Sequence, residues 1–401
     1  REKGLLRLLG SAFMNIRITD WLKFKTNFGI DYYNRKSMTS LDRRHPKSAS
    51  NNGYLRQSTS DTRRYTWTNT LNFNQTFQDI HSVAGVAGIE LFDGTFSRFH
   101  QQGFDLDEFM TNTPAGIGDK TGTSKNPPRI GGDKTHSNLL SYFTQWNYTY
   151  DNRYNVSASL RYDESSKFVK SNKGALFWSL GAAWDIANEK FAEDYQFLNQ
   201  LKLRTSYGTT GNQDGIADFS AFDGYNKVSY NGKPGYTNNE LGNPDLKWET
   251  SAQFDLGLDF RMFSNRINGT IDFYHKSTKD LLMWKKISQL SGSTQIQTNA
   301  GSILNQGVEF AMNGVPVRTK DFEWSVSANI TYNKNKITDL GTWANKDNKF
   351  IDGDVLYEIG KSLGTWCMVE WAGVNPKTGE GWFYDQKGGK TEDISAAPAV
   401  D

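Results

Sequence analysis

The chain has 401 residues, a formal net charge of +2, an apolar content of 36% and an aromatic content of 14%. The nearly neutral charge gives no basis for binding nucleic acid, and the single cysteine, Cys367, excludes an internal disulfide or a cysteine metal cluster. Apolar content below the usual ~45–50% with many aromatic rings is unusual for a large soluble core. The sequence contains no run of 18 apolar residues, so it predicts no membrane-spanning helix. The composition suits one thin apolar surface and a wet surface elsewhere.

Apolar and polar residues alternate along most of the chain, which is the period of a β-strand with one apolar face. The alternation predicts about twelve strands, at residues 12–18, 22–32, 65–77, 81–92, 140–150, 154–162, 178–184, 201–207, 248–260, 267–274, 308–312 and 322–332. The connections between them are short near 19–21, 79–81, 151–153, 262–266 and 315–321. They are long at about 35–62, 101–137, 209–246 and 277–304, and after 334.

Strand length and connection length together predict the fold class. Several predicted strands have 11 to 13 residues, against ~5–6 in soluble proteins. Alternating short turns and long loops is the hairpin layout of outer-membrane barrels, with short periplasmic turns and long extracellular loops. We therefore expect an all-β fold, an antiparallel transmembrane β-barrel in contact with a lipid bilayer. A large soluble β-sandwich or propeller is the alternative, because its inner faces also alternate.

The two faces of each strand then receive different roles. Aromatic and aliphatic side chains on the apolar face should contact lipid or form the aromatic girdles at the headgroup level. We expect this of Trp67, Trp146, Tyr148, Tyr150, Tyr154, Trp248, Phe254, Leu256, Leu258, Phe260 and Trp324. Charged side chains on the other face should line a wet lumen, where they either border a transport route or are simply hydrated. These are Arg161, Glu249, Asp255, Asp259 and Arg261.

The sequence offers little support for catalysis or metal binding. Residues 119–123, DKTGT, match the phosphorylation motif of P-type ATPases, but they lie in a Gly/Pro-rich loop, so we interpret the match as chance. None of the five histidines has metal-ligand spacing. The acidic groups at 105–108 and 352–354 fit either a calcium site or an exposed solvated loop. We expect no catalytic residues, no metal and no cofactor.

Aromatic residues in the expected long loops are candidates for contact with a substrate or a partner protein, because exposed rings stack on sugars and peptides. Packing within the loops is an equally good interpretation. The candidates are Phe219, Phe222, Tyr225, Trp343, Trp366 and Trp371.

Several long blocks resemble one family. The stretch YDNRYNVSASLRYDESSKF at 150–168, followed by ALFWSLGAAWDIANEKF, resembles the middle of the barrel in SusC/RagA-type TonB-dependent outer-membrane transporters. So do LKLRTSYGTTGNQ at 201–213, the segment 241–282 that begins LGNPDLKWETSAQF, NAGSILNQGVEFAMNG at 299–314 and WAGVNPKTGEGWFYD at 371–385. The blocks are collinear and cover most of the chain.

The resemblance implies a 22-stranded barrel with an N-terminal plug. Residues 1–401 would then be an internal part of one TonB-dependent receptor barrel domain, without the plug, the TonB-contacting segment or the terminal strands. It also implies a non-enzymatic importer of oligosaccharides or peptides in the outer membrane of a Gram-negative bacterium. A SusD-like surface lipoprotein would be its partner, and the TonB complex would supply energy through the missing N-terminal part. The rival hypotheses are a passive porin, a surface-binding barrel or adhesin without transport, and a barrel hydrolase.

Overall fold

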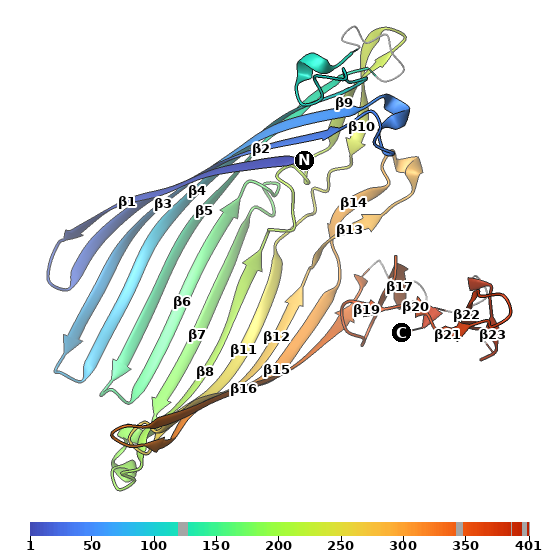
Figure 1. Cartoon of the computed structure of the whole chain (residues 1–401). Helices are drawn as coiled ribbons and strands as arrows, with labels where there is room; N and C mark the ends of the chain where they lie inside the picture. The colour runs from blue at the N-terminus through green and yellow to red at the C-terminus, as the bar shows by residue number, and fades with distance from the viewer. Residues whose placement is uncertain (119–126, 342–347, 386, 395–398, 401) are drawn as a thin grey trace.

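The computed structural model describes the chain except residues 119–126, 342–347, 386, 395–398 and 401. Its main element is one curved sheet of twelve strands, in which each strand pairs antiparallel with its neighbours (Figure 1). In sheet order the strands are β1 (Glu2–Arg17), β2 (Leu22–Leu41), β3 (Tyr54–Phe77), β4 (His81–Phe104), β5 (Arg129–Tyr150), β6 (Tyr154–Ser165), β7 (Gly174–Asp185), β8 (Leu198–Asn212), β11 (Glu249–Met262), β12 (Ile267–Lys279), β15 (Ser302–Arg318) and β16 (Glu323–Asp339). Strands β1 and β16 are the two edges of the sheet.

The all-β, antiparallel prediction is confirmed, but several strands are longer than the alternation indicates. Strands β3 and β4 each have 24 residues. The connection expected at 35–62 shrinks to 42–53, and the one expected at 101–137 shrinks to 105–128. The added segments, such as LRQSTSDTRR at 55–64, are polar on both faces. They remain strands because the backbone hydrogen bonds of the ladder continue, with Thr59 opposite both Lys36 and Phe99.

Short and long connections alternate between the two ends of the sheet. At one end, here called the turn end, the strands are joined through residues 18–21, 78–80, 151–153, 186–197, 263–266 and 319–322. Among these connections, only 186–197 contains helical turns, η3 (Ile186–Asn188) and η4 (Lys190–Ala192). At the other, the loop end, the connections are 42–53, 105–128, 166–173, 213–248 and 280–301, and the chain continues there beyond β16. Figure 1 shows the tight turns along the lower left edge and the long connections on the opposite side.

The long connections contain small elements of their own. Connections 42–53 and 105–128 contain the 3-10 turns η1 (Ala49–Asn51) and η2 (Pro114–Gly116). Hairpin β9 (Gly224–Tyr230) with β10 (Lys233–Glu240) follows β8. Strands β13 (Leu282–Lys286) and β14 (Gln295–Asn299), with η5 (Gln289–Ser291) between them, follow β12. Beyond β16 lie the short strands β17 (Lys349–Asp352), β18 (Val355–Glu358), β19 (Thr365–Trp366), β20 (Met368–Val369), β21 (Trp371–Val374), β22 (Gly381–Tyr384), β23 (Lys390–Thr391) and β24 (Ala399–Val400). No helix in the described parts of the chain is both long and apolar enough to span a membrane.

The register keeps apolar side chains together across the sheet. In β11, Leu258 lies opposite Leu203 of β8 and Ile271 of β12, whereas Asp259 lies opposite Lys202 and Thr270. We call the side that carries Leu258 the apolar face and the side that carries Asp259 the polar face. On the apolar face Leu160, Leu180 and Leu256 are 46%, 54% and 41% exposed. A soluble sandwich would bury such side chains under a second layer, so that alternative is excluded.

Trp248 is the exception among the predicted lipid-facing residues, and that prediction was wrong. Strand β11 begins one residue later, so Trp248 is not held by the ladder and turns into a buried cluster at the loop end. Its ring centroid lies 5.3 Å from that of Phe168 and 5.7 Å from that of Phe177, and its indole Nε1 donates to the Lys173 carbonyl at 3.2 Å. Ile216 and Leu246 complete the loop-end core.

Candidate functional site: the polar face of the sheet

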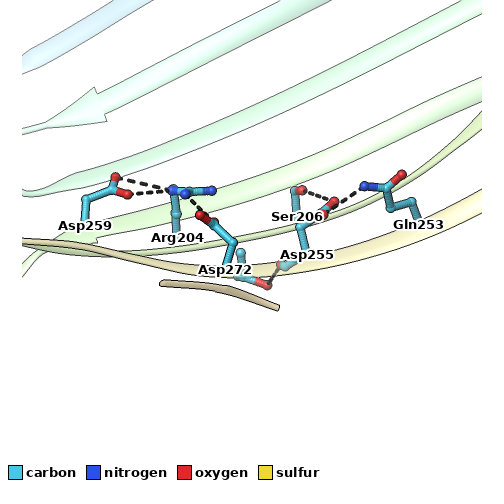
Figure 2. Close-up of polar contacts among 7 residues, drawn as sticks. Arg204, Ser206, Gln253, Asp255, Asp259 and Asp272 are labelled. Atoms are coloured by element: carbon cyan, nitrogen blue, oxygen red, sulfur yellow. Dashed lines mark hydrogen bonds and ion pairs between the residues drawn. The ribbon is translucent and has the colours of Figure 1, made fainter. Parts of the chain in front are cut away.

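Arg204 of β8 connects three strands on the polar face. Its Nε donates to both carboxylate oxygens of Asp259 in β11, at 3.1 and 3.3 Å, and its Nη2 donates to Asp272 in β12. Figure 2 shows the guanidinium between the two carboxylates. Beside it, Asp255 accepts from Gln253 at 2.9 Å and from Ser206 at 3.4 Å. The arrangement ties neighbouring strands together through charge-assisted hydrogen bonds.

Gly257 is what lets Arg204 reach past β11. The register places Gly257 directly between Arg204 and Asp272. A Cβ atom at this position would lie 2.5 Å from the guanidinium carbon of Arg204 and 2.6 Å from a carboxylate oxygen of Asp272. Any side chain would therefore displace the bridge. Because glycine has no side chain, Arg204 of β8 and Asp272 of β12 can approach each other across β11.

A second cluster, centred on Arg161 of β6, spans the opposite half of the sheet. Its Nε donates to Asp163 at 2.7 Å, and its Nη2 donates to Ser141 of β5 at 2.7 Å and to Glu90 of β4 at 3.2 Å. The guanidinium also lies 5.6 Å from the centroid of the Phe143 ring. Ser141 and Asp163 are buried, so this cluster is less accessible to water than the one around Arg204.

All five charges expected on the lumen side lie on the polar face, where the register groups them with other polar residues. Four of them are hydrogen-bonded to neighbouring groups. Besides the contacts of Arg161, Asp255 and Asp259, Glu249 accepts from the Asn212 side chain at 3.2 Å and from the Leu282 backbone N–H at 3.2 Å. Arg261 is exposed near the turn end.

The register also places the remaining girdle and lipid-facing candidates together, on the apolar face. They are Trp67, Trp146, Tyr148, Tyr150, Tyr154, Phe254, Leu256, Leu258, Phe260 and Trp324. The three tyrosines gather at the turn end, where the rings of Tyr150 and Tyr154 stack at 6.3 Å and the Tyr148 hydroxyl is 2.7 Å from Nδ1 of His81. This is the arrangement expected of an aromatic girdle.

One buried carboxylate, Glu189, organises the turn end. It accepts from the Tyr154 hydroxyl at 2.5 Å, from Trp184 Nε1 at 3.1 Å and from Arg153 Nη1 at 3.0 Å. The hydrogen bonds from Tyr154, then Trp184 and Arg153, hold the pKa of the Glu189 carboxyl below its usual range. Because Arg153 also bonds Asp151, Glu189 joins the 151–153 turn to the connection between β7 and β8.

A cavity of about 640 Å³ opens on the polar face at the loop end. Its wall comes from β3, β4 and β5, with Arg64, Phe92 and Phe96 among the lining residues. Connections 166–173 and 213–248 fold over it and contribute Lys167 and Gln213. The long connections thus cover part of the polar face, which the alternation of the strands does not indicate.

The described candidate loop aromatics lie on two segments of the chain, the connection after β8 and the segment beyond β16. Phe219, Phe222 and Tyr225 are exposed on the connection after β8, and Trp366 is exposed beyond β16. Trp371 packs edge-on against Phe383, with ring centroids 5.6 Å apart. Trp343 and the DKTGT segment at 119–123 lie outside the described residues.

The described parts of the chain contain no group of three His, Cys, Asp or Glu side chains that could hold a metal ion. Two histidines contact other side chains: Nε2 of His136 lies 2.8 Å from Asp93, and Nδ1 of His81 lies 2.7 Å from the Tyr148 hydroxyl. The acidic groups at 105–108 and 352–354 are likewise not among such groups.

Sequence reasoning missed Arg204 and Asp272, which complete the first cluster, and Glu90 and Ser141, which complete the second. The residues of the first cluster stand at alternate positions of predicted strands, in LKLRTSY and GTIDFYH. A further signal was available in DLGLD at 255–259, where a glycine stands between two aspartates on the same face. The pairing of β8 with β11 and of β11 with β12 was needed to connect these signals, because Arg204 and Asp272 are 68 positions apart.

Residues 11–395 match the protein family described as TonB dependent receptor-like, beta-barrel. A TonB-dependent receptor of Formosa agariphila is 33% identical over 395 residues, which cover 97% of this chain and 36% of that receptor. TonB-dependent receptor SusC of Bacteroides thetaiotaomicron is 35% identical over 278 residues, which cover 65% of this chain and 28% of that receptor. The chain therefore spans about a third of the length of these relatives.

Solved structures agree. The RagAB peptide transporter superposes with a TM-score of 0.84 at 27% identity, covering 100% of this chain and 44% of that chain. The siderophore receptor PiuA from Acinetobacter baumannii has a TM-score of 0.55 at 13% identity, over 90% of this chain and 50% of that chain. At this identity the similarity supports only the shared fold.

Proposed function

We propose that this chain, which belongs to the TonB-dependent receptor β-barrel family, is the wall of an active importer of oligosaccharides or peptides. The family consists of outer-membrane receptors and transporters rather than enzymes, so the chain is an outer-membrane protein of the SusC/RagA type. In the full-length protein, further strands would pair with the edges at β1 and β16 and close the barrel, because exposed strand edges carry unpaired hydrogen-bonding groups.

The observation that carries this proposal is the continuity of the two faces across the sheet. On the apolar face, Tyr154 and Tyr162 are eight residues apart in β6. At ~3.3 Å per residue this separation is ~26 Å, or ~20 Å along the membrane normal at a tilt of ~40°. The apolar band of an outer-membrane barrel is ~25 Å tall. We assign the apolar face to lipid, with Tyr148, Tyr150 and Tyr154 as its periplasmic girdle.

The polar face then lines the lumen. Its Arg161 and Arg204 clusters stiffen the wall through bonds between strands, instead of offering free charges to a passing solute. Of the five lumen charges, Arg261 is the one that we assign to contact with a plug or with solvent, since it is exposed at the turn end.

The loop end faces the outside and receives the substrate. The chain is similar to SusC and to RagAB, and RagAB is a peptide transporter. We propose a SusD-like lipoprotein as the partner on the loop side and the TonB complex as the energy source through a plug. The exposed rings of Phe219, Phe222, Tyr225, Trp366 and Trp371 are our candidates for contact with a substrate or a partner, and Trp343, outside the described residues, remains a candidate from the sequence.

Uptake tests this function. Labelled peptides or oligosaccharides are offered to cells that carry the gene of the full-length receptor together with a gene for a SusD-like lipoprotein, and the same cells without TonB serve as the control. We expect uptake to fall to background without TonB. Undiminished uptake would favour a passive porin, and surface binding without any uptake would favour an adhesin.

A further inference from the structure

The loop-end cavity is bordered by charged side chains of both signs. Arg64 comes from β3 in the wall, and Lys167, Gln213, Asp214 and Asp218 come from the connections that cover it. These charges border an open volume of about 640 Å³. Ligand sites are typically such cavities, with a few polar groups directed at the occupant.

Lys167 and Asp218 form a half-buried but loose ion pair. The Lys167 ammonium donates to the Ile216 carbonyl at 2.9 Å and lies 3.8 Å from the nearest Asp218 oxygen. Their side chains are 16% and 19% exposed. Charge-assisted hydrogen bonds are usually ~2.7–2.9 Å long. Both groups therefore keep hydrogen-bonding capacity for a third partner in the cavity.

Gln213 supplies an independent sign of a ligand. Its side-chain oxygen is buried, and no described residue donates a hydrogen bond to it. Leaving a buried acceptor unpaired costs ~1–3 kcal/mol, so such an atom calls for an explanation. A ligand N–H or O–H in the cavity would satisfy it.

The wall offers an apolar surface beside the charges. Phe92 and Phe96 of β4 line the cavity, and Gly94 lies between them, opposite Arg64. A Cβ atom at Gly94 would lie 3.1 Å from the Phe92 ring, so the missing side chain leaves the ring accessible. Arg64 lines the same cavity, and its guanidinium lies 5.6 Å from the centroid of the Tyr33 ring on β2.

We propose that this cavity is a subsite for a peptide, an inference that rests on the import function above and selects one of its two substrate classes. Arg64 and Lys167 bind a carboxylate, Asp214 and Asp218 bind an ammonium group, and Gln213 accepts a backbone N–H. Phe92 and Phe96 pack against an apolar side chain. A neutral oligosaccharide would bury these charges without opposite charges of its own, which is unfavourable.

Binding to the full-length receptor, purified with its lipoprotein, tests the proposal. The probes are a tryptic digest of casein, with bound peptides identified by mass spectrometry, and a set of neutral maltooligosaccharides. Matched controls exist in the chain: Arg63 precedes Arg64 but lies on the apolar side, and Lys170 is exposed on the same connection as Lys167. All variants are first checked for the heat-modifiable gel mobility of a folded barrel.

We expect Arg64→Met and Lys167→Met to weaken peptide binding about tenfold or more, because each removes a charge-assisted hydrogen bond. Arg63→Met and Lys170→Met should stay within about twofold. Gln213→Glu should shift the selected peptides towards additional cationic groups. Unchanged affinity in both cavity variants, or preferential binding of maltooligosaccharides, would overturn the subsite.

The uptake assay separates this inference from the proposed function. TonB-dependent peptide uptake that is insensitive to Arg64→Met and Lys167→Met refutes the subsite and leaves the importer intact. Loss of peptide binding in these variants, combined with uptake that does not require TonB, supports the subsite and refutes active import.

Discussion

At the loop end, Phe168, Phe177, Ile216, Leu246 and Trp248 form a buried apolar core, whereas at the turn end one carboxylate, Glu189, accepts from three donors. The loop-end connections reach 36 residues, at 213–248, while most turn-end connections have three or four. A long connection can fold back over the polar face and bury its own apolar side chains. A short turn cannot. At the turn end, Glu189 on the longest connection there, 186–197, instead accepts hydrogen bonds from Tyr154 and Arg153.

The difference has a functional meaning. The loop-end core holds the connections that cover the 640 Å³ cavity, so its packing shapes the cavity that we propose as a subsite. The Glu189 bonds connect strands and turns at the turn end of the sheet. Between the two ends, the Arg204 cluster connects strands without any buried core. We therefore expect substitutions of Trp248, Arg204 and Glu189, the central residues of these three regions, to change stability by different amounts.

Trp248→Ala should have the largest effect. Truncating a buried aromatic residue costs ~3–5 kcal/mol, and here it also leaves the Lys173 carbonyl without its indole donor. We expect this loss in the free energy of unfolding, measured by denaturant titration in liposomes. Trp366→Ala, at a side chain that is 66% exposed, is the matched control and should change little. Equal effects of the two substitutions would refute a loop-end core.

Arg204→Met should have an intermediate effect of about 1 kcal/mol, because it leaves the carboxylates of Asp259 and Asp272 close together without a cation, although all three are partly exposed to water. Arg261→Met removes an exposed arginine from the same face and should be nearly neutral. The same unfolding titration compares them. If Gly257→Val, which displaces the guanidinium, costs less than Arg261→Met, the bridge has no role in stability.

Glu189→Gln should have a local effect. It keeps the shape of the side chain but replaces charge-assisted bonds to Tyr154, Trp184 and Arg153 by weaker ones. We expect faster amide hydrogen exchange in residues 186–197, with the unfolding midpoint almost unchanged. Glu193→Gln, on the same connection and exposed, should leave exchange as in the wild type. Slower exchange in Glu189→Gln would contradict the assigned role.

The smallest effect concerns pH. Because the pKa of Glu189 is lowered in the folded protein, its contribution to stability is fully present above the ordinary carboxyl pKa of ~4.3. That contribution is lost as the pH falls through the lowered value. Exchange in 186–197, corrected for its intrinsic pH dependence, should accelerate below about pH 4 in the wild type and less so in Glu189→Gln. Parallel profiles for the two proteins would show that another group titrates.

The residue pattern was sufficient where one face of a strand is apolar. Phe254, Leu256 and Leu258 share a face in the structure as predicted, since period-2 alternation fixes the face without knowledge of the partner strand. The alternation did not predict the parts of β3 and β4 nearest the loop end, because polar residues occur there on both faces and leave no period-2 pattern. It failed at Trp248 because alternation continues by chance one residue beyond the ladder.

The sequence by itself determined the class of the fold, the direction of the side chains and the alternation of short and long connections, because these depend on local period and on turn residues. Only the tertiary structure decided that Arg204 meets Asp272, that Trp248 is buried and that two loop connections enclose a charged cavity. Each of these joins residues 68 or more positions apart, or depends on where a long connection folds. No local pattern encodes such contacts, since they follow from strand register and from the packing of the connections over the polar face.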